Sequence, residues 1–136
     1  MHARLATVAG RLTAISIVTQ DVKESCRFYR TLGLDVPEPP PGEDHFEFEL
    51  PNGGLKLMWD TELLIKQLDP DWEEPRGHRV GLAFECESSA DVDETYARLV
   101  AAGFRAKRPA WDAFWGQRYA QVYDPDGQPV DLYASL

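Results

Sequence analysis

Cysteine is scarce in this chain, which has only Cys26 and Cys86 and no Cys-x-x-Cys pair. Both lie in patterned apolar segments, so we expect two buried, reduced thiols and no disulfide framework. No run of about 18 apolar residues occurs, which excludes a membrane-spanning helix. Residues 1–10 lack the apolar core of a secretory signal peptide. We therefore expect a cytoplasmic protein.

Basic residues are also few, with 14 lysines and arginines against 23 aspartates and glutamates and a net charge of −9. This balance does not supply the attraction to phosphates that nucleic-acid binding needs. We therefore expect neither a nucleic acid nor a membrane as partner. The acidic charge would attract a cationic ligand, although such a charge more often serves solubility. The 136 residues fit a single domain with its own core.

One pattern occurs twice in the chain. Asp-Val-x-Glu-(Ser/Thr) begins at Asp21 and again at Asp91, and a glycine follows each copy at the same distance, Gly33 and Gly103. The aspartate and the glutamate three residues later form a capping box, and apolar residues recur at helical spacing between them and the glycine. Glycine suits the left-handed residue that closes a helix. The pattern predicts two equivalent helices, each beginning at its aspartate.

Strand patterns surround both predicted helices. A β-branched or alternating run precedes each helix, at residues 12–19 and 79–86. A hairpin follows each helix, because Pro, Asn, Asp and Gly cluster between two further runs. The hairpin strands are residues 45–50 with 55–59, and 117–123 with 130–134. The chain is thus predicted to be α+β, with two βαβββ modules at about residues 11–60 and 77–136. Residues 61–76 form the linker, with a short helix at 62–68.

Alternation along the strands gives each strand two faces. Leu55 and Leu57 are expected to face the first helix, and Lys56 to face away from it. Asp131 is equivalent to Lys56 in the second copy, so both charges are expected on a wet cleft or an interface. They could form an ion pair that perturbs their pKa values, although a structural pair is the better interpretation.

Three features together resemble the vicinal oxygen chelate superfamily, from about residue 11 to the end of the chain. They are the repeat, the helix sequence DVKESCRFYRTLGL and the segment WGQRYAQVYDPDGQPVDLY. That superfamily includes glyoxalase I, extradiol dioxygenases, fosfomycin-modifying enzymes and the bleomycin resistance proteins. The resemblance implies paired curved mixed sheets around a cleft, with the helices on the convex side. It also implies a homodimer, because a second subunit commonly completes the cleft.

The resemblance further implies where a metal would be bound, on the first and last strands of each module. Those positions fall on Ala14, Lys56, Gly81 and Asp131, of which only Asp131 could bind a cation. Catalytic metals need about three protein ligands. We therefore predict no metal and no other cofactor. His78 and His45 are not assigned as ligands, because His78 lies three residues before Gly81 and would have to change both register and face.

Aromatic residues are the most informative candidates for ligand binding. Trp111, Phe114 and Trp115 crowd an expected loop before strand 117–123, and Trp59 ends strand 55–59. Flat rings beside a cleft suit planar or cationic ligands, whereas Trp115 is better explained as covering the core. The predicted cleft residues are Ser16, Lys56, Met58, Trp59, Trp111, Phe114, Tyr119, Gln121, Asp131 and Tyr133.

We therefore predict a non-catalytic binding protein, similar to the bleomycin resistance proteins. It would sequester a planar or cationic compound in a dimer cleft and so could confer antibiotic resistance. The alternative is a glyoxalase-like lyase, isomerase or dioxygenase with a divergent active site. Its weak catalytic candidates are Asp131, Glu85 and Tyr119, and a divalent metal is expected only under this alternative. A third option is a scaffold or regulatory subunit with a vestigial cleft.

Overall fold

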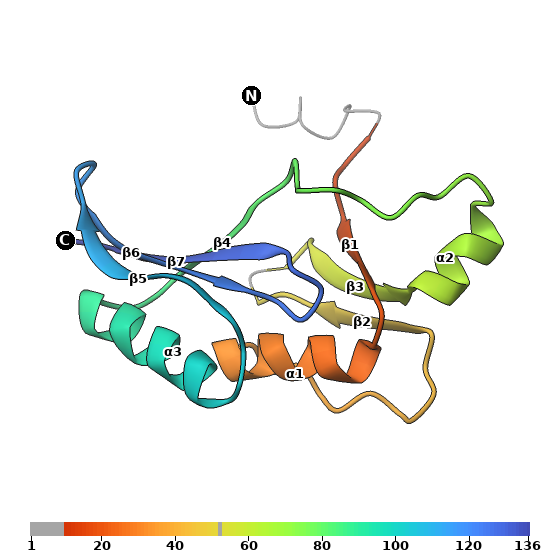
Figure 1. The fold of residues 1–136 in the computed structure, drawn as a ribbon, viewed down its shortest axis with the longest axis horizontal. Coiled ribbons are helices and arrows are strands. Elements are labelled where there is room, and N and C mark those ends of the chain that lie inside the picture. Colours follow the sequence, from red (N-terminus) through yellow and green to blue (C-terminus); the bar gives the residue numbers. More distant parts are fainter. Residues whose placement is uncertain (1–9, 52) are drawn as a thin grey trace.

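Residues 10–51 and 53–136 are described by a computed structural model. The elements follow the duplicated order (Figure 1). The first module contains β1 (Ala14–Thr19), α1 (Val22–Leu32), β2 (His45–Glu49) and β3 (Lys56–Thr61). Helix α2 (Glu62–Leu68) follows, as predicted. The second module contains β4 (Leu82–Glu85), α3 (Ser89–Ala101), β5 (Ala106–Ala113), β6 (Gln117–Tyr123) and β7 (Pro129–Ser135).

The strands form two mixed sheets, in the orders β1-β3-β2 and β4-β7-β6-β5. In each sheet the first strand of the module runs parallel to the last strand, and the other pairs are antiparallel. This confirms the predicted α+β class. Helices α1 and α3 lie on the same side of the two sheets (Figure 1), which leaves one face of each sheet uncovered by a helix. We call these the first and second open faces. No helix in the described ranges is long and apolar enough to span a membrane.

The sheets differ by one strand. Residues 34–44 of the first module form no strand, and their prolines cannot donate the hydrogen bonds that a sheet requires. In the second module β5 occupies the corresponding place. Trp111 lies on β5, so the prediction that it is a loop residue was wrong. Pro109 and two register shifts between Ala106 and Trp111 hide the strand by interrupting its alternation.

The helix boundaries show where capping was predicted correctly and where it was not. The Asp21 carboxylate accepts a hydrogen bond from the Glu24 amide, and Gly33 ends α1 with a φ of 137°. Helix α3 instead begins two residues earlier than predicted, because Ser88 caps it by accepting from the Asp91 amide. Asp91 therefore lies inside the first turn of the helix. Serine caps a helix as well as aspartate does. The start of α3 is therefore set by the upstream serine and not by the aspartate that is equivalent in the repeat.

A single core lies between the helices and both sheets. Its largest fully buried side chains include Trp59, Tyr29 and Phe28 from the first module, with Leu99 and Leu132 from the second. The Tyr29 hydroxyl donates to a carboxylate oxygen of Asp124 at 2.9 Å, which links α1 to the β6–β7 turn. Both groups are buried, so this bond satisfies polar atoms that water cannot reach.

Both cysteines were expected to be buried, reduced thiols. Cys26 is buried in the core and Cys86 is only partly buried, and both are free. Burial raises the pKa of the Cys26 thiol to about 12. Burial also raises the pKa of Cys86. Neither thiol is therefore activated as a nucleophile at neutral pH.

Two arginines join the modules reciprocally at the ends of their helices. Arg27 of α1 donates to the carbonyl of Ala102 at the end of α3, at 3.2 Å. Arg98 of α3 donates to the carbonyls of Thr31 and Leu32 at the end of α1, at 2.9 and 3.3 Å. The last carbonyls of a helix have no partner within it and carry the negative end of its dipole. Each module thus caps the helix of the other.

Candidate functional site

The second open face is built by three neighbouring strands. Ala120, Val122 and Leu132 are buried, so the residues that alternate with them point the other way. The register places Tyr119 opposite Tyr133. The residues brought together on this face are Trp111, Tyr119, Gln121, Asp131 and Tyr133, all predicted cleft residues.

These side chains form an aromatic cluster. The Tyr119 ring is central: its centroid lies 5.4 Å from Trp111, 5.3 Å from Trp115 and 6.2 Å from Tyr133. The first two contacts are edge-to-face and the third is stacked, which are favoured arrangements of aromatic pairs. Trp115 was expected to cover the core, but it is half-exposed and belongs to this cluster. The cluster leaves ring surface at the open face for a ligand.

A cation already lies on this cluster. The guanidinium carbon of Arg108 is 3.5 Å from the centroid of the Trp111 ring. Arg108 is opposite Gln121 in the register, so it projects from the same face. Arg108 was not predicted from the sequence, because the register shifts on β5 conceal which face it occupies. The contact shows that a planar cation fits the Trp111 ring.

Asp131 provides a carboxylate beside the rings. It accepts hydrogen bonds from the Tyr119 hydroxyl at 2.6 Å and from the Gln121 amide at 3.0 Å. Burial, followed by the bond to Asp131, raises the pKa of Tyr119 to about 12. Tyr119 is therefore a hydrogen-bond donor at neutral pH and a poor general base.

The first open face carries a continuous row of polar groups across its three strands. The Ser16 hydroxyl donates to Asp60 at 2.7 Å, and the other oxygen of Asp60 meets His45 Nδ1. His45 Nε2 lies 2.7 Å from Glu47, whose second oxygen accepts from Lys56 Nζ at 2.7 Å. We call these five residues the polar row. The bonds to Asp60 and then to Glu47 raise the pKa of His45, so the row favours the imidazolium.

The polar row corrects one hypothesis about Lys56. Its ammonium pairs with Glu47 on the adjacent strand, whereas the hypothesis paired it with Asp131. Asp131 is instead bonded within the second sheet. His45 was considered only as a metal ligand, although His45 and Glu47 alternate on one strand and must share a face. The partner Asp60 could not be assigned because it depends on the pairing of β2 with β3.

Two other predicted cleft residues do not lie on the open faces. The prediction for Trp59 was wrong: it is fully buried in the core, 5.8 Å from the Tyr29 ring and 6.4 Å from the Phe46 ring. Two residues beyond Leu57, it points toward the helix as Leu57 does. Phe114 lies in the turn between β5 and β6, is 96% exposed and contacts Trp115. Ser16, Lys56 and Met58 do lie on the first open face.

The residues at the family's metal positions do not fit a metal. Ala14 is opposite Lys56, whose ammonium is bonded to Glu47. The strand register also corrects the third position, since Ala83 rather than Gly81 is opposite Asp131. Alanine, lysine and glycine provide no ligand for a divalent cation. Within residues 10–51 and 53–136, no group of three or more His, Cys, Asp or Glu side chains is placed to hold a metal ion.

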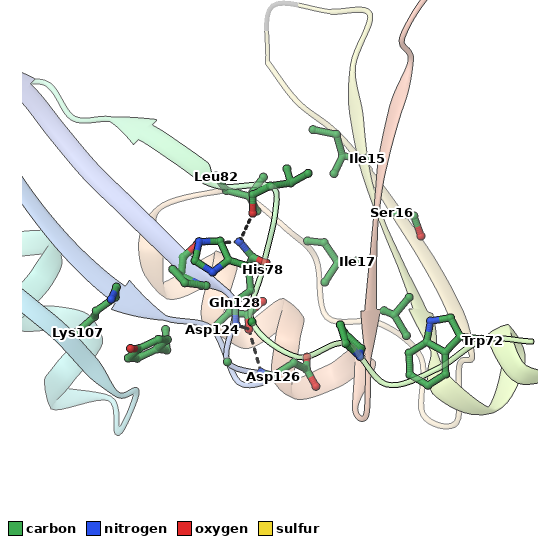
Figure 2. Close-up of a pocket in the computed structure, with 17 residues that line it drawn as sticks. Ile15, Ser16, Ile17, Trp72, His78, Leu82, Lys107, Asp124, Asp126 and Gln128 are labelled. Carbon is green, nitrogen blue, oxygen red and sulfur yellow. Dashed lines mark hydrogen bonds between the residues drawn. The ribbon is translucent and has the colours of Figure 1, made fainter.

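A cavity of about 550 Å³ lies between β1, the linker and the β6–β7 turn (Figure 2), and it meets the first open face at Ser16. Of the ten predicted cleft residues only Ser16 lines it. His78 also lines it and is exposed, in the segment that leads into β4. We call it the intermodule cavity.

Comparison with known proteins identifies the family. The model of the Glyoxalase/Bleomycin resistance protein/Dioxygenase superfamily matches residues 11–132. The chain belongs to this superfamily. The match extends from before β1 into β7, so it includes both modules.

Solved superfamily structures share the fold. A glyoxalase-related enzyme from Fulvimarina pelagi is 23% identical, with a TM-score of 0.77 over 92% of this chain and 88% of that one. A glyoxalase/bleomycin resistance protein/dioxygenase from Nocardioides is 29% identical, with a TM-score of 0.71 over 99% of this chain and 91% of that one.

One curated relative is much longer. A putative sugar lactone lactonase from Rhizobium meliloti (strain 1021) is 34% identical over 87 residues. The match covers 62% of this chain and 27% of the relative. The matched part of the chain therefore spans about a quarter of that protein.

Proposed function

We propose that this superfamily member binds a planar, cationic small molecule on the second open face. The observation that carries the proposal is the Arg108 guanidinium stacked on Trp111 within the aromatic cluster. A ligand with a flat cationic group would replace Arg108 on that ring and gain the nearby Asp131 carboxylate. This is the sequestering function predicted from the sequence, with no chemical step.

The charges of the two open faces support a cationic ligand. The strand register directs Asp131 and Glu85 to the second open face together with Arg108. On the first open face it directs Glu47, Glu49 and Asp60 outward, with Lys56 and His45. Carboxylates therefore outnumber the permanent cations by five to two. Together with the net charge of −9, this surplus raises the local concentration of cations.

The test is to titrate the protein with planar organic cations, including bleomycin-type antibiotics, and to measure binding by calorimetry. Trp111→Ala should weaken binding by roughly tenfold, the range of a partly desolvated cation–π contact. Arg108→Gln should strengthen binding, because it removes both the competing cation and its positive charge. Trp72→Ala is the matched control, since Trp72 lies on the linker and contacts Lys66. Failure of every cation to bind, or equal binding by Trp111→Ala, contradicts the proposal.

We also propose a homodimer, which is supported by an exposed apolar patch beside the aromatic cluster. Phe114, Trp115 and Leu136 are all exposed, and the Leu136 amide donates to Gly116 within the same turn. Light scattering should give twice the 15.4 kDa chain mass, and Phe114→Asp should shift it toward the monomer. A monomeric mass for the unaltered chain would contradict this part of the proposal.

A second candidate is an enzyme, which the polar row favours. Asp60 fixes His45 Nδ1, as a carboxylate orients the histidine of many acid–base sites. Two similar proteins carry enzyme names, a putative sugar lactone lactonase and a glyoxalase-related enzyme. Turnover of lactones or 2-oxoaldehydes that is lost in His45→Asn would support this candidate. Elemental analysis after dialysis would show whether a stoichiometric metal is involved.

A further inference from the structure

The intermodule cavity is large enough for a second, separate ligand. Its volume of about 550 Å³ falls within the range of small-molecule sites, roughly 300–1,000 Å³. β1 forms one wall, the segment after α2 crosses over it, and the β6–β7 turn closes the base (Figure 2). The aromatic cluster of the second open face does not contribute to it.

One side of this cavity is apolar. Ile15, Ile17 and Leu82 line it from the facing edges of the two sheets, and Trp72 lies at one end (Figure 2). β1 and β4 are the edge strands of their sheets, and they are not paired with each other in the described residues. The side chains of Ile15, Ile17 and Leu82 therefore line the gap between the unpaired edges. Such a wall suits a hydrocarbon chain.

The carboxylates in the wall already have partners. Asp124 accepts hydrogen bonds from the Tyr29 hydroxyl at 2.9 Å and from the amides of Asp126 and Gln128 at 2.9 and 3.0 Å. Asp126 accepts from the Gln20 amide at 3.0 Å. These acceptors are engaged in holding the turn, so they are not arranged to receive a ligand's donors.

The cationic and donor groups of Lys107 and His78 differ from the carboxylates in the wall, because they have no hydrogen-bond partner among the described residues. Lys107 and His78 lie toward the end of the cavity away from Trp72 (Figure 2). Among residues 10–51 and 53–136, neither side chain forms a hydrogen bond or an ion pair. The Lys107 ammonium lies 5.5 Å from the centroid of the Tyr123 ring. Both side chains are exposed, so a ligand can reach them, and a negative charge on it would match the ammonium.

We propose that the intermodule cavity binds an amphiphilic carboxylate, with its carboxylate at Lys107 and His78 and its hydrocarbon chain along Ile15, Ile17 and Leu82. This site is independent of the proposed cation site and takes a ligand of opposite charge. The two sites can therefore be occupied and tested separately.

The experiment uses the full chain and the fluorescent probe 1-anilinonaphthalene-8-sulfonate, displaced by decanoate. Val80 lines the cavity and is 65% exposed, so charges can be placed there without disturbing the core. Val80→Glu should weaken decanoate binding and Val80→Lys should strengthen it, each by about 1.5- to fivefold, the range of exposed charge pairs. Lys107→Met should weaken it by a similar factor. Unchanged unfolding transitions confirm that the variants are folded.

Trp111→Ala is the control that separates the two sites, because decanoate binding should not change in this variant. Opposite shifts in the two Val80 variants, with Trp111→Ala unchanged, support the proposal. The proposal is overturned if decanoate does not bind, if both Val80 variants bind equally, or if Trp111→Ala abolishes binding. None of these results alters the test of cation binding, which depends on Trp111 and Arg108.

Discussion

The two modules share one pattern of residues toward the core and differ in what they place on their open faces. Leu57 and Leu132 are equivalent and both buried, whereas their neighbours Lys56 and Asp131 carry opposite charges. The first open face carries the polar row, and the second carries rings around one carboxylate. The core positions must fill a shared interior. The open positions meet no such requirement, so the two copies offer different chemistry on similar frames.

The largest expected effect separates a core tryptophan from a tryptophan of the open face. Trp59→Ala should lower the free energy of unfolding by about 3–5 kcal/mol, because it empties a fully buried site. Trp111→Ala should cost only about 1 kcal/mol, since it removes contacts between partly buried rings. Urea denaturation followed by circular dichroism measures both. Equal losses would mean that Trp111 is a core residue and that the comparison of the two faces fails.

The next effect concerns the buried bond that crosses between the modules. Tyr29→Phe removes the hydroxyl that donates to Asp124, which should cost about 1–3 kcal/mol at neutral pH. Burial already raises the pKa of Asp124, and the Tyr29 bond partly opposes this. Its loss should raise that pKa further, so the cost should shrink at acidic pH, where the neutral carboxyl needs the donor less. Tyr96→Phe is the control, because no hydrogen bond of its hydroxyl occurs among the described residues.

A smaller effect concerns the pH dependence of the first module. The pKa of His45 is raised in the folded chain by Asp60 and then by Glu47. The stabilisation is therefore fully present below about pH 6.5, the usual histidine value, and is lost as the pH rises through the higher folded value. Because the side chain is 41% exposed, the effect should stay below about 1 kcal/mol. Unfolding measured from pH 5 to 9 should lose this slope in His45→Asn and retain it in His78→Asn.

The smallest change affects titration without much effect on stability. Asp131→Asn should lower the pKa of Tyr119 from about 12, because the neutral amide no longer favours the protonated phenol. The pKa should remain above 10, since burial is the largest cause of the shift and is unchanged. Absorbance at the phenolate wavelength measures the titration. A pKa unaffected by this substitution would show that Tyr119 and Asp131 do not interact.

The order of elements could be predicted from local patterns. The capping residues, the glycine after α1 and the turn residues of both hairpins act over a few positions, so sequence alone located most strands and α2. Strand β5 was not predicted, because Pro109 and the register shifts along the strand remove the alternation that identifies a strand. The start of α3 was misplaced because two candidate caps, Ser88 and Asp91, lie close together.

The candidate sites were less predictable because they depend on pairing between distant strands. Alternation correctly directed Lys56 and Asp131 away from the helices. It could not show that Glu47 would reach Lys56, or that Asp60 would reach both Ser16 and His45, since those pairs require the sheet register. The intermodule cavity also depends on how two sheet edges meet, which no local pattern encodes.

The reciprocal caps made by Arg27 and Arg98 also bear on how two chains could associate. Each arginine recognises the end of the opposite helix through backbone carbonyls, and it would recognise the same helix equally well on another copy. Two chains that exchanged second modules would recover every one of these bonds. The choice between a closed chain and an intertwined pair therefore rests on the path of residues 61–76, so shortening that segment is a direct way to favour the intertwined form.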